Sequence, residues 1–209
     1  MNAEKIRQYI EELYQHRTPL SRQVYEALTE LSDFIPVVDN DVARCLQLLL
    51  RITKAQRVLE IGTSIGYSTT MMAQVMRENG GRITTIEFDE KVVKQAQINF
   101  ERAGVADLIK IQIGDARVLV PQLQGTFDFI FQDVDKHLYP ELFNDCVRLL
   151  KQGGLLVAED TLFPVIDLDP KWHHLIAPIE EFNHLVVDCS KLESTILPVG
   201  DGVTIAIKK

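Results

Sequence analysis

The chain has 209 residues, 46% of them hydrophobic and 25% charged, a composition typical of globular proteins rather than disordered or fibrous ones. The net charge of −8 at pH 7 disfavours binding to nucleic acid or to anionic lipid. Residues 1–15 contain no apolar signal segment, and no apolar run approaches the length of a membrane span. The three cysteines are far apart and match no metal-binding spacing. The sequence therefore predicts a cytoplasmic protein with no nucleic-acid or membrane partner.

Residues 1–55 are predicted to form a helical extension. Apolar residues recur at helical spacing in this part of the chain, at Ile6, Ile10, Leu13, Val24, Leu28 and Leu31. Either Asp39 or Asn40 is suited to cap a third helix, because both side chains accept hydrogen bonds from free helix N–H groups.

From residue 57 onward, apolar runs of strand length alternate with helical stretches. The predicted strands are 58–61, 82–87, 108–113, 128–132 and 154–159, and the predicted helices are 67–77, 90–103, 140–150 and 172–187. Two further strands, 191–197 and 203–208, are joined by a short connection with Gly and Asp that is typical of a hairpin. This alternation predicts a doubly wound, Rossmann-like α/β fold, with a mostly parallel sheet that ends in an antiparallel pair. We expect one domain over 1–209, with its α/β core at 56–209.

A turn with two glycines follows the first predicted strand, in the segment Glu60-Ile-Gly62-Thr-Ser-Ile-Gly66. Glycines at a strand-to-helix turn let a ligand approach the backbone, and a helix N-terminus attracts an anionic group. Glu87 ends the next strand, 21 residues beyond Gly66, where an acid accepts hydrogen bonds from a ribose. These residues predict a nucleoside-containing ligand across the carboxyl ends of the first two strands.

The glycine spacing distinguishes between the nucleoside cofactors. A dinucleotide fingerprint reads G-x-G-x-x-G, whereas here the two glycines are four apart and Glu60 precedes them. A carboxylate at that position disfavours a pyrophosphate and favours the cationic S-adenosylmethionine, so an NAD-linked oxidoreductase is the weaker hypothesis. Asp115 follows the third strand and either accepts a hydrogen bond from the adenine amino group or caps the next helix; the two roles are compatible.

Carboxylates also follow the fourth and fifth predicted strands. Asp133 comes after one strand and Glu159-Asp160 after the other, and neighbouring strand tips in a doubly wound sheet open onto one crevice. Their mutual repulsion would require a bound cation or a raised pKa on one of them, and oxygen ligands suit Mg²⁺, Ca²⁺ or Mn²⁺. Lys136, three residues beyond Asp133, is a candidate ion-pair partner or base. Alternatively, these acids lie apart on solvated loops.

These segments resemble the class I S-adenosylmethionine-dependent O-methyltransferases, in the cation-dependent branch with the caffeoyl-CoA and catechol O-methyltransferases. The resemblance covers residues 34–209. The segments that carry it are Arg57-Val-Leu-Glu-Ile-Gly-Thr-Ser-Ile-Gly-Tyr-Ser68, Thr85-Ile-Glu-Phe-Asp89, Gly114-Asp-Ala116, Phe131-Gln-Asp-Val-Asp-Lys-His-Leu-Tyr139, Gly153-Gly154, Glu181-Phe-Asn183 and Leu197-Pro-Val-Gly-Asp-Gly202. Of these, the D-x-D-K-x-x-Y and L-P-x-G-D-G patterns are the most specific.

The resemblance implies a seven-stranded sheet whose last strand is antiparallel, and a homodimer. It implies a cofactor site that contains Val37 or Val38, Glu60, Gly62, Gly66, Tyr67, Ser68, Glu87, Asp115 and Asp133. It assigns Asp133, Glu159 and Asp160 to a divalent cation such as Mg²⁺, Mn²⁺ or Ca²⁺, with Asp133 and Lys136 as the catalytic residues. The activity it implies is methyl transfer from S-adenosylmethionine to a hydroxyl of a small, catechol-like acceptor.

The pair Glu159-Asp160 departs from the Asp-Asn pair that is usual in this family. The glutamate is one methylene longer, and Asp160 adds a negative charge where the family has an amide. The loop 161–170, which would border the acceptor, also differs from the usual W-S-G-x-V pattern. Three hypotheses stay open: a cation-dependent O-methyltransferase, a metal-independent methyltransferase for another acceptor, and a non-catalytic cofactor-binding homologue.

Overall fold

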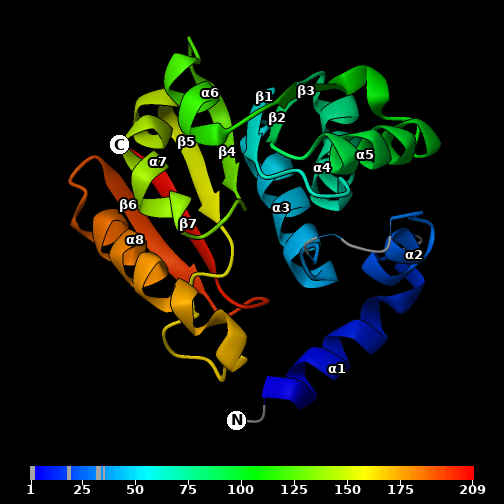
Figure 1. The fold of residues 1–209 in the computed structure, drawn as a ribbon, viewed down its shortest axis with the longest axis horizontal. Helices are drawn as coiled ribbons and strands as arrows, with labels where there is room; N and C mark the ends of the chain where they lie inside the picture. Colours follow the sequence, from blue (N-terminus) through cyan, green and yellow to red (C-terminus); the bar gives the residue numbers. More distant parts are fainter. Residues whose placement is uncertain (1–2, 18–19, 32–33, 35) are drawn as a thin grey trace.

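The computed structural model describes residues 3–17, 20–31, 34 and 36–209 (Figure 1). Its seven strands form one sheet in the order β3-β2-β1-β4-β5-β7-β6. The strands are β1 (Arg57–Ile61), β2 (Arg82–Glu87), β3 (Ile109–Ile113), β4 (Phe127–Gln132), β5 (Leu150–Ala158), β6 (Leu192–Leu197) and β7 (Val203–Lys208). Strands β1 to β5 pair in parallel, whereas β7 runs antiparallel to both of its neighbours. The predicted α/β fold with a seven-stranded, mostly parallel sheet is therefore confirmed.

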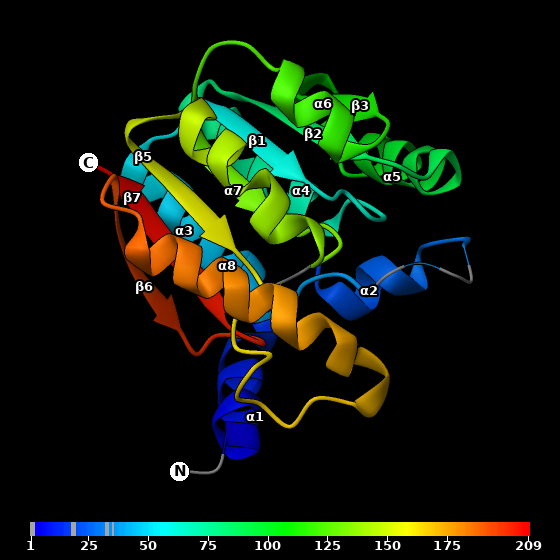
Figure 2. The same cartoon turned by 60° about the vertical axis from the view of Figure 1, so that its left-hand side comes forward.

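Helices cover both faces of the sheet (Figures 1 and 2). One face carries α3 (Asn40–Thr53), α4 (Tyr67–Asn79) and α5 (Glu90–Arg102), and the other carries α6 (Ala116–Gln122), α7 (Leu138–Leu149) and α8 (Ile176–Asp188). Phe129 and Phe131 of β4 pack into the core on the α3 side, while Ile130 between them packs on the α7 side. Because both faces are covered, the central strands are apolar on both sides, as the continuous apolar runs predicted.

Besides α3, the extension contains α1 (Ala3–Tyr14), the short 3₁₀ segment η1 (Gln15–Arg17) and α2 (Arg22–Ala27). Leu31 was expected on a helix together with Val24 and Leu28, but this was wrong, because α2 ends at Ala27. Side chains of α5 replace the helical hydrogen bonds there: Arg102 donates to the Leu28 carbonyl oxygen at 2.8 Å, and the Glu30 amide donates to Gln95 Oε1 at 3.2 Å. Tertiary contacts therefore stop this helix early.

Two other boundaries also differ from the predicted ones. Strand β5 begins at Leu150, which pairs with Phe127 before a register shift, so the strand is longer than the predicted 154–159. The predicted helix 172–187 begins instead as the 3₁₀ segment η3 (Pro170–Leu175), which leads into α8. A further 3₁₀ segment, η2 (Ala106–Leu108), precedes β3. Among the described residues, no helix is both long and apolar enough to cross a membrane. The division of the chain into a helical extension at 1–55 and an α/β core at 56–209 stays a prediction.

Candidate functional site

Residues 62–68, here called the cofactor loop, comprise the connection from β1 to α4 and the first two residues of α4, at the carboxyl end of the sheet. Gly62 has φ +95°, and a Cβ atom on it would lie 2.1 Å from the carbonyl oxygen of Asp133. The Gly62 amide donates to the Ile86 carbonyl at 3.0 Å, and the Asp133 amide donates to the Ile61 carbonyl at 2.9 Å. Only a glycine therefore lets the cofactor loop pass this closely to the tip of β4.

Gly66 caps the N-terminus of α4 with φ +86°, and a Cβ atom there would lie 2.4 Å from the ring of Phe100. The free N–H groups of the first turn of α4 form a site that attracts an anionic group. Tyr67, a predicted cofactor residue, is buried, and its hydroxyl donates to Asn40 Oδ1 at 2.8 Å. Its side chain therefore supports the cofactor loop from the side of the extension.

Glu60 is buried on β1, beneath the first turn of α4. Its carboxylate accepts hydrogen bonds from Ser68 Oγ at 2.6 Å, from Thr85 Oγ1 at 2.7 Å and from the Thr69 hydroxyl. Burial raises the pKa of Glu60 to about 7, although the three hydroxyl donors act in the opposite direction. Two predicted cofactor residues, Glu60 and Ser68, are therefore hydrogen-bonded to each other.

Glu87 lies at the tip of β2, as predicted, and its carboxylate holds two loops together. Its Oε2 accepts from the amides of Thr63 and Ser64 at 3.1 and 2.9 Å, and its Oε1 accepts from the amides of Phe88 and Asp89 at 2.8 and 3.1 Å. Phe88 is 75% exposed and was not recognised from the sequence. The available signal was an aromatic residue directly after the acid at a strand tip.

Of the remaining predicted cofactor residues, Asp115 follows β3 at the same end of the sheet. Asp115 caps α6 by accepting from the Arg117 amide at 2.8 Å, and hydrogen bonding to the Arg117 side chain lowers the pKa of Asp115. Its capping role is thus confirmed, while its contact with adenine stays a prediction. Val37 and Val38 are both buried in the segment that joins α2 to α3.

Asp133, Glu159 and Asp160 form what we call the carboxylate cluster. Each offers one carboxylate oxygen, and these oxygens lie within 4.8 Å of one another. Neighbouring strands bring them together, because Gln132 of β4 is the register partner of Ala158 of β5. The prediction that the acids after β4 and β5 converge is confirmed.

Lys136 Nζ lies among these carboxylates. It donates to Asp133 Oδ1 at 2.8 Å, forms an ion pair with Asp160 Oδ2 at 2.8 Å and donates to the Tyr139 hydroxyl at 3.2 Å. Lys136 is only 8% exposed. Burial disfavours the charged ammonium, but the attraction of Asp133 and Asp160 outweighs it and raises the pKa of Lys136 well above its usual range.

Tyr139 was quoted only as part of a motif and was not recognised as a site residue. Its buried hydroxyl lies 2.9 Å from the Gln132 carbonyl oxygen and 3.1 Å from the Glu159 carbonyl oxygen, so it joins the tips of β4 and β5. Its spacing of three residues from Lys136, across the turn that leads into α7, was the available signal.

The donor set of the carboxylate cluster fits a hard divalent cation, since it consists of oxygens alone. Lys136 uses one oxygen of Asp133 and one of Asp160, and a carboxylate can accept through both oxygens. Burial and the nearby charges of Asp160 and Asp133 raise the pKa of Glu159 well above its usual range. The negative charge of the cluster is thus only partly balanced by Lys136.

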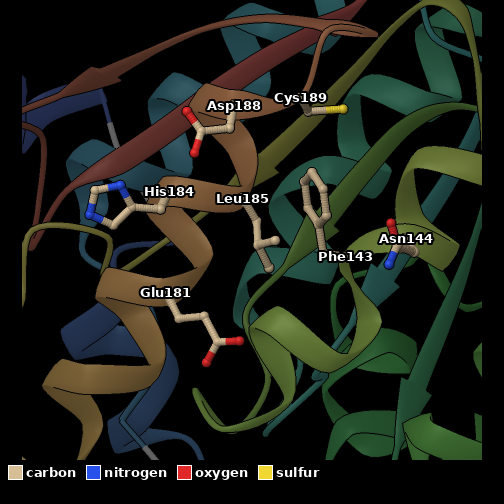
Figure 3. A pocket seen from close by; sticks show the side chains of 7 residues that line it. All are labelled: Phe143, Asn144, Glu181, His184, Leu185, Asp188 and Cys189. Atoms are coloured by element: carbon tan, nitrogen blue, oxygen red, sulfur yellow. The ribbon is translucent and has the colours of Figure 1, made fainter.

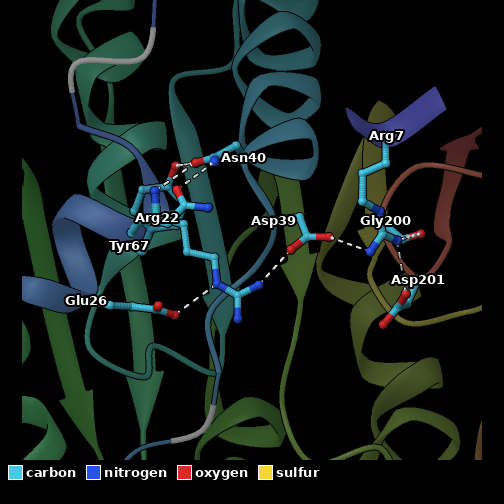
Figure 4. Close-up of polar contacts among 9 residues, drawn as sticks. Arg7, Arg22, Glu26, Asp39, Asn40, Tyr67, Gly200 and Asp201 are labelled. Carbon is cyan, nitrogen blue, oxygen red and sulfur yellow. Dashed lines mark hydrogen bonds and ion pairs between the residues drawn. The ribbon is translucent and has the colours of Figure 1, made fainter. Parts of the chain in front are cut away.

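The extension contacts the β6–β7 connection, where Arg7 lies against Gly200 and Asp201 (Figure 4). Gly200, in the β6–β7 connection, is so placed that a Cβ atom on it would lie 3.2 Å from Glu159 Oε1. Arg7 of α1 donates to the Gly200 carbonyl at 3.5 Å and forms ion pairs with Asp201 and Asp39 at 3.6 and 3.8 Å. Helix α1 therefore contacts the connection that lies next to Glu159 of the carboxylate cluster.

A separate pocket of about 520 Å³ lies between α7 and α8 (Figure 3). The apolar side chains of Phe143 and Leu185 and the carboxylates of Glu181 and Asp188 are among its lining groups. It shares no residue with the cofactor loop or the carboxylate cluster.

Comparison with known proteins agrees with this geometry. The family model described as O-methyltransferase matches residues 16–209. A catechol O-methyltransferase from Niastella koreensis is 33% identical, covering 99% of this chain and 97% of that protein. Caffeoyl-CoA O-methyltransferase 1 from Eucalyptus globulus is 29% identical, covering 92% of this chain and 87% of that protein. An O-methyltransferase from Bacillus cereus, solved in complex with SAH, has a TM-score of 0.76 and 27% identity, covering 98% of this chain and 97% of that one. The resemblance drawn from the sequence is thereby confirmed, and the chain belongs to the O-methyltransferase family.

Proposed function

We propose that this protein transfers a methyl group from S-adenosylmethionine to one hydroxyl of a small acceptor that carries two adjacent hydroxyls on an aromatic ring. The observation that carries the proposal is the position of the carboxylate cluster and Lys136 directly beside the cofactor loop, where Gly62 contacts Asp133. The catechol O-methyltransferase that is 33% identical over nearly the whole chain supports this class of acceptor.

The cofactor loop has the groups needed for S-adenosylmethionine, and the Bacillus cereus relative solved with SAH supports this choice. The N-terminus of α4 would bind the methionine carboxylate through free N–H groups. Glu87 would accept from the ribose hydroxyls, which requires that it exchange some of its four backbone donors. Phe88, which follows Glu87 and is exposed, would pack against the adenine ring.

Asp133, Glu159 and Asp160 would hold the divalent cation. When bound, a divalent cation there supplies positive charge that lowers the pKa of an acceptor hydroxyl from the ordinary phenol value of about 10. Three carboxylates in this cluster bring more negative charge than Lys136 alone balances, which favours the uptake of a cation. Tyr139 keeps the tips of β4 and β5 at a fixed separation, and with them Asp133 and Glu159.

Lys136 Nζ is the group we assign to proton transfer. In the described structure it holds its proton between Asp133 and Asp160, and it would accept the acceptor proton only after losing its own. Once the acceptor hydroxyl has lost its proton to Nζ, its oxygen forms the new bond to the methyl carbon while the carbon–sulfur bond breaks. The chain's contribution is to hold both reactants in line and to exclude water from this crevice.

A methyl-transfer assay tests the proposal. Purified protein is incubated with S-adenosylmethionine and either 3,4-dihydroxybenzoate or the matched monohydroxy compound 4-hydroxybenzoate, with Mg²⁺ or with excess chelator, and products are identified by mass spectrometry. We expect methylation of the dihydroxy compound alone, in the presence of Mg²⁺ alone. Full activity under chelator would favour the metal-independent hypothesis, and equal methylation of both compounds would reject recognition of adjacent hydroxyls.

We also propose that the protein forms a homodimer through α1. The apolar residues Ile6, Tyr9 and Leu13 of this amphipathic helix are exposed in the single chain. Light scattering of the wild-type protein should give twice the chain mass, and Leu13→Glu should reduce it. A monomeric wild-type protein would reject the dimer.

A further inference from the structure

Tyr25, a side chain of α2, links the helical extension to the cofactor loop. Tyr25 is 3% exposed and is the buried residue of this short helix. Its hydroxyl donates to the Gly66 carbonyl oxygen at 2.9 Å and lies 2.9 Å from Thr70 Oγ1. Its ring packs edge-on against the ring of Tyr67, with 5.3 Å between the ring centroids. Tyr25 therefore contacts the start of α4 both by hydrogen bonding through its hydroxyl and by packing of its ring.

The Gly66 carbonyl is the first acceptor of α4. It accepts from the Thr70 amide at 2.9 Å, which is the first hydrogen bond of the helix, and from Tyr25 at the same time. Gly66 itself has φ +86°, and a glycine has more backbone conformations available to it than any other residue. The Tyr25 hydroxyl thus restrains the residue that sets the direction of the cofactor loop into α4.

Neighbouring contacts show that this end of the loop is held from outside. Asn99 of α5 donates to the Ile65 carbonyl at 3.0 Å, one residue before Gly66. Asn40 Oδ1 accepts from the Tyr67 hydroxyl and from the Arg22 amide, both at 2.8 Å (Figure 4). The extension and α5 therefore bind consecutive carbonyls of the cofactor loop.

We propose that Tyr25 is a positioning residue that holds the N-terminus of α4 in its cofactor-binding shape, so that docking of the extension sets the affinity for the cofactor. This inference rests on the proposed use of S-adenosylmethionine at the cofactor loop. Because binding linkage is reciprocal, the bound cofactor must in turn strengthen the docking of α2. Tyr25 lies on the cofactor side of the site and makes no contact with the carboxylate cluster, so the chemical step should not depend on it.

The test uses Tyr25→Phe, which removes the hydroxyl and keeps the ring. S-adenosylhomocysteine is titrated calorimetrically into the wild-type protein and the variant, and methyl transfer is measured over a range of S-adenosylmethionine concentrations. Loss of one buried hydrogen bond predicts a dissociation constant about tenfold higher. The KM for S-adenosylmethionine should rise by a similar factor, whereas kcat should change less than about twofold.

Two control variants separate this effect from general destabilisation. Tyr14→Phe makes the same chemical change on α1, at a tyrosine that is 42% exposed, and should leave the dissociation constant unchanged. Thr70→Val removes the other partner of Tyr25 and leaves its bond to the Gly66 carbonyl, so it should have at most a small effect. An equal loss of affinity in Thr70→Val and Tyr25→Phe would overturn the proposal, as would wild-type affinity in Tyr25→Phe.

Amide hydrogen exchange of the wild-type protein gives an independent test, because it does not depend on whether any variant folds. Saturating S-adenosylhomocysteine should slow exchange in α2 (Arg22–Ala27) as well as at the start of α4. Protection of α4 without protection of α2 would overturn the inference. If the wild-type protein does not bind S-adenosylhomocysteine at all, the proposed function fails first, and the inference fails with it.

Discussion

The two halves of the site lie side by side but are built by different means. Around the cofactor loop, charged groups are satisfied within the protein: Glu60 accepts from three hydroxyls, and Glu87 accepts from four backbone amides. In the carboxylate cluster, three acids lie together, and the ammonium of Lys136 pairs with two of them, Asp133 and Asp160.

This difference indicates which half of the site, the cofactor loop or the carboxylate cluster, needs a bound ligand before it can act. The cofactor loop is held in shape by its own hydrogen bonds and glycine contacts, so it is preorganised before any ligand binds. The carboxylate cluster keeps an excess of negative charge that only a proton or an added cation can balance. Changes at the cofactor loop should therefore alter stability and cofactor affinity, and changes at the cluster should alter turnover.

The largest effect is expected at the contact between the two halves. Gly62→Ala would place a Cβ atom 2.1 Å from the Asp133 carbonyl oxygen, in a backbone conformation with φ +95°. We expect a loss of about 4 kcal/mol or more in the free energy of unfolding, measured by urea denaturation. Gly80→Ala is the matched control, because φ there is +71° but a Cβ would meet open space, and it should cost about 1 kcal/mol. Similar losses in both variants would contradict the role of this contact.

Lys136→Met tests whether the carboxylate cluster acts on turnover alone. The variant lacks the proposed proton acceptor, so kcat for methyl transfer should fall by about 10³-fold, while the dissociation constant for S-adenosylhomocysteine stays within about twofold. Lys151→Met, at an exposed lysine paired with Asp128 at the other end of the sheet, should leave both values unchanged. A loss of cofactor affinity as large as the loss of kcat would show that the two halves are not independent.

Glu60 should make the stability of the cofactor half depend on pH. Its pKa is about 7 in the folded protein and 4.5 in the unfolded chain, so the folded state binds the proton more tightly. Its stabilising contribution is complete below about pH 4.5 and is lost as the pH rises through 7, which amounts to about 2 kcal/mol between pH 5 and pH 8. Unfolding free energies of the wild-type protein and of Glu60→Gln, measured across this range, should diverge accordingly. Parallel curves would disprove this assignment.

Tyr139→Phe should have the smallest effect of the four. The variant loses the hydroxyl that joins Lys136 to the carbonyls of Gln132 and Glu159, but its ring still packs on Phe182 at 5.1 Å between centroids. We expect kcat to fall about tenfold, with little change in the KM for S-adenosylmethionine. An unchanged kcat would remove Tyr139 from the positioning of Lys136.

Much of the fold was determined by local sequence pattern. The centre of a strand that is buried on both faces must be apolar, as 129–131 is, and a close turn such as that at Gly62 excludes any side chain. These constraints act within a few residues, so the strands, their parallel pairing and the position of the cofactor loop follow from the chain itself. The convergence of Asp133 with Glu159 and Asp160 also follows, because neighbouring parallel strands end at one edge.

Other features depend on contacts between residues far apart in the sequence, and only the tertiary structure decided them. Helix α2 ends early because Arg102 and Gln95 of α5 bind its following backbone. Lys136 holds two carboxylates from two different strands, and Tyr25 reaches a carbonyl 41 residues away. Periodicity and motif spacing report the environment of neighbouring residues, whereas such hydrogen bonds form only after the sheet and helices have packed.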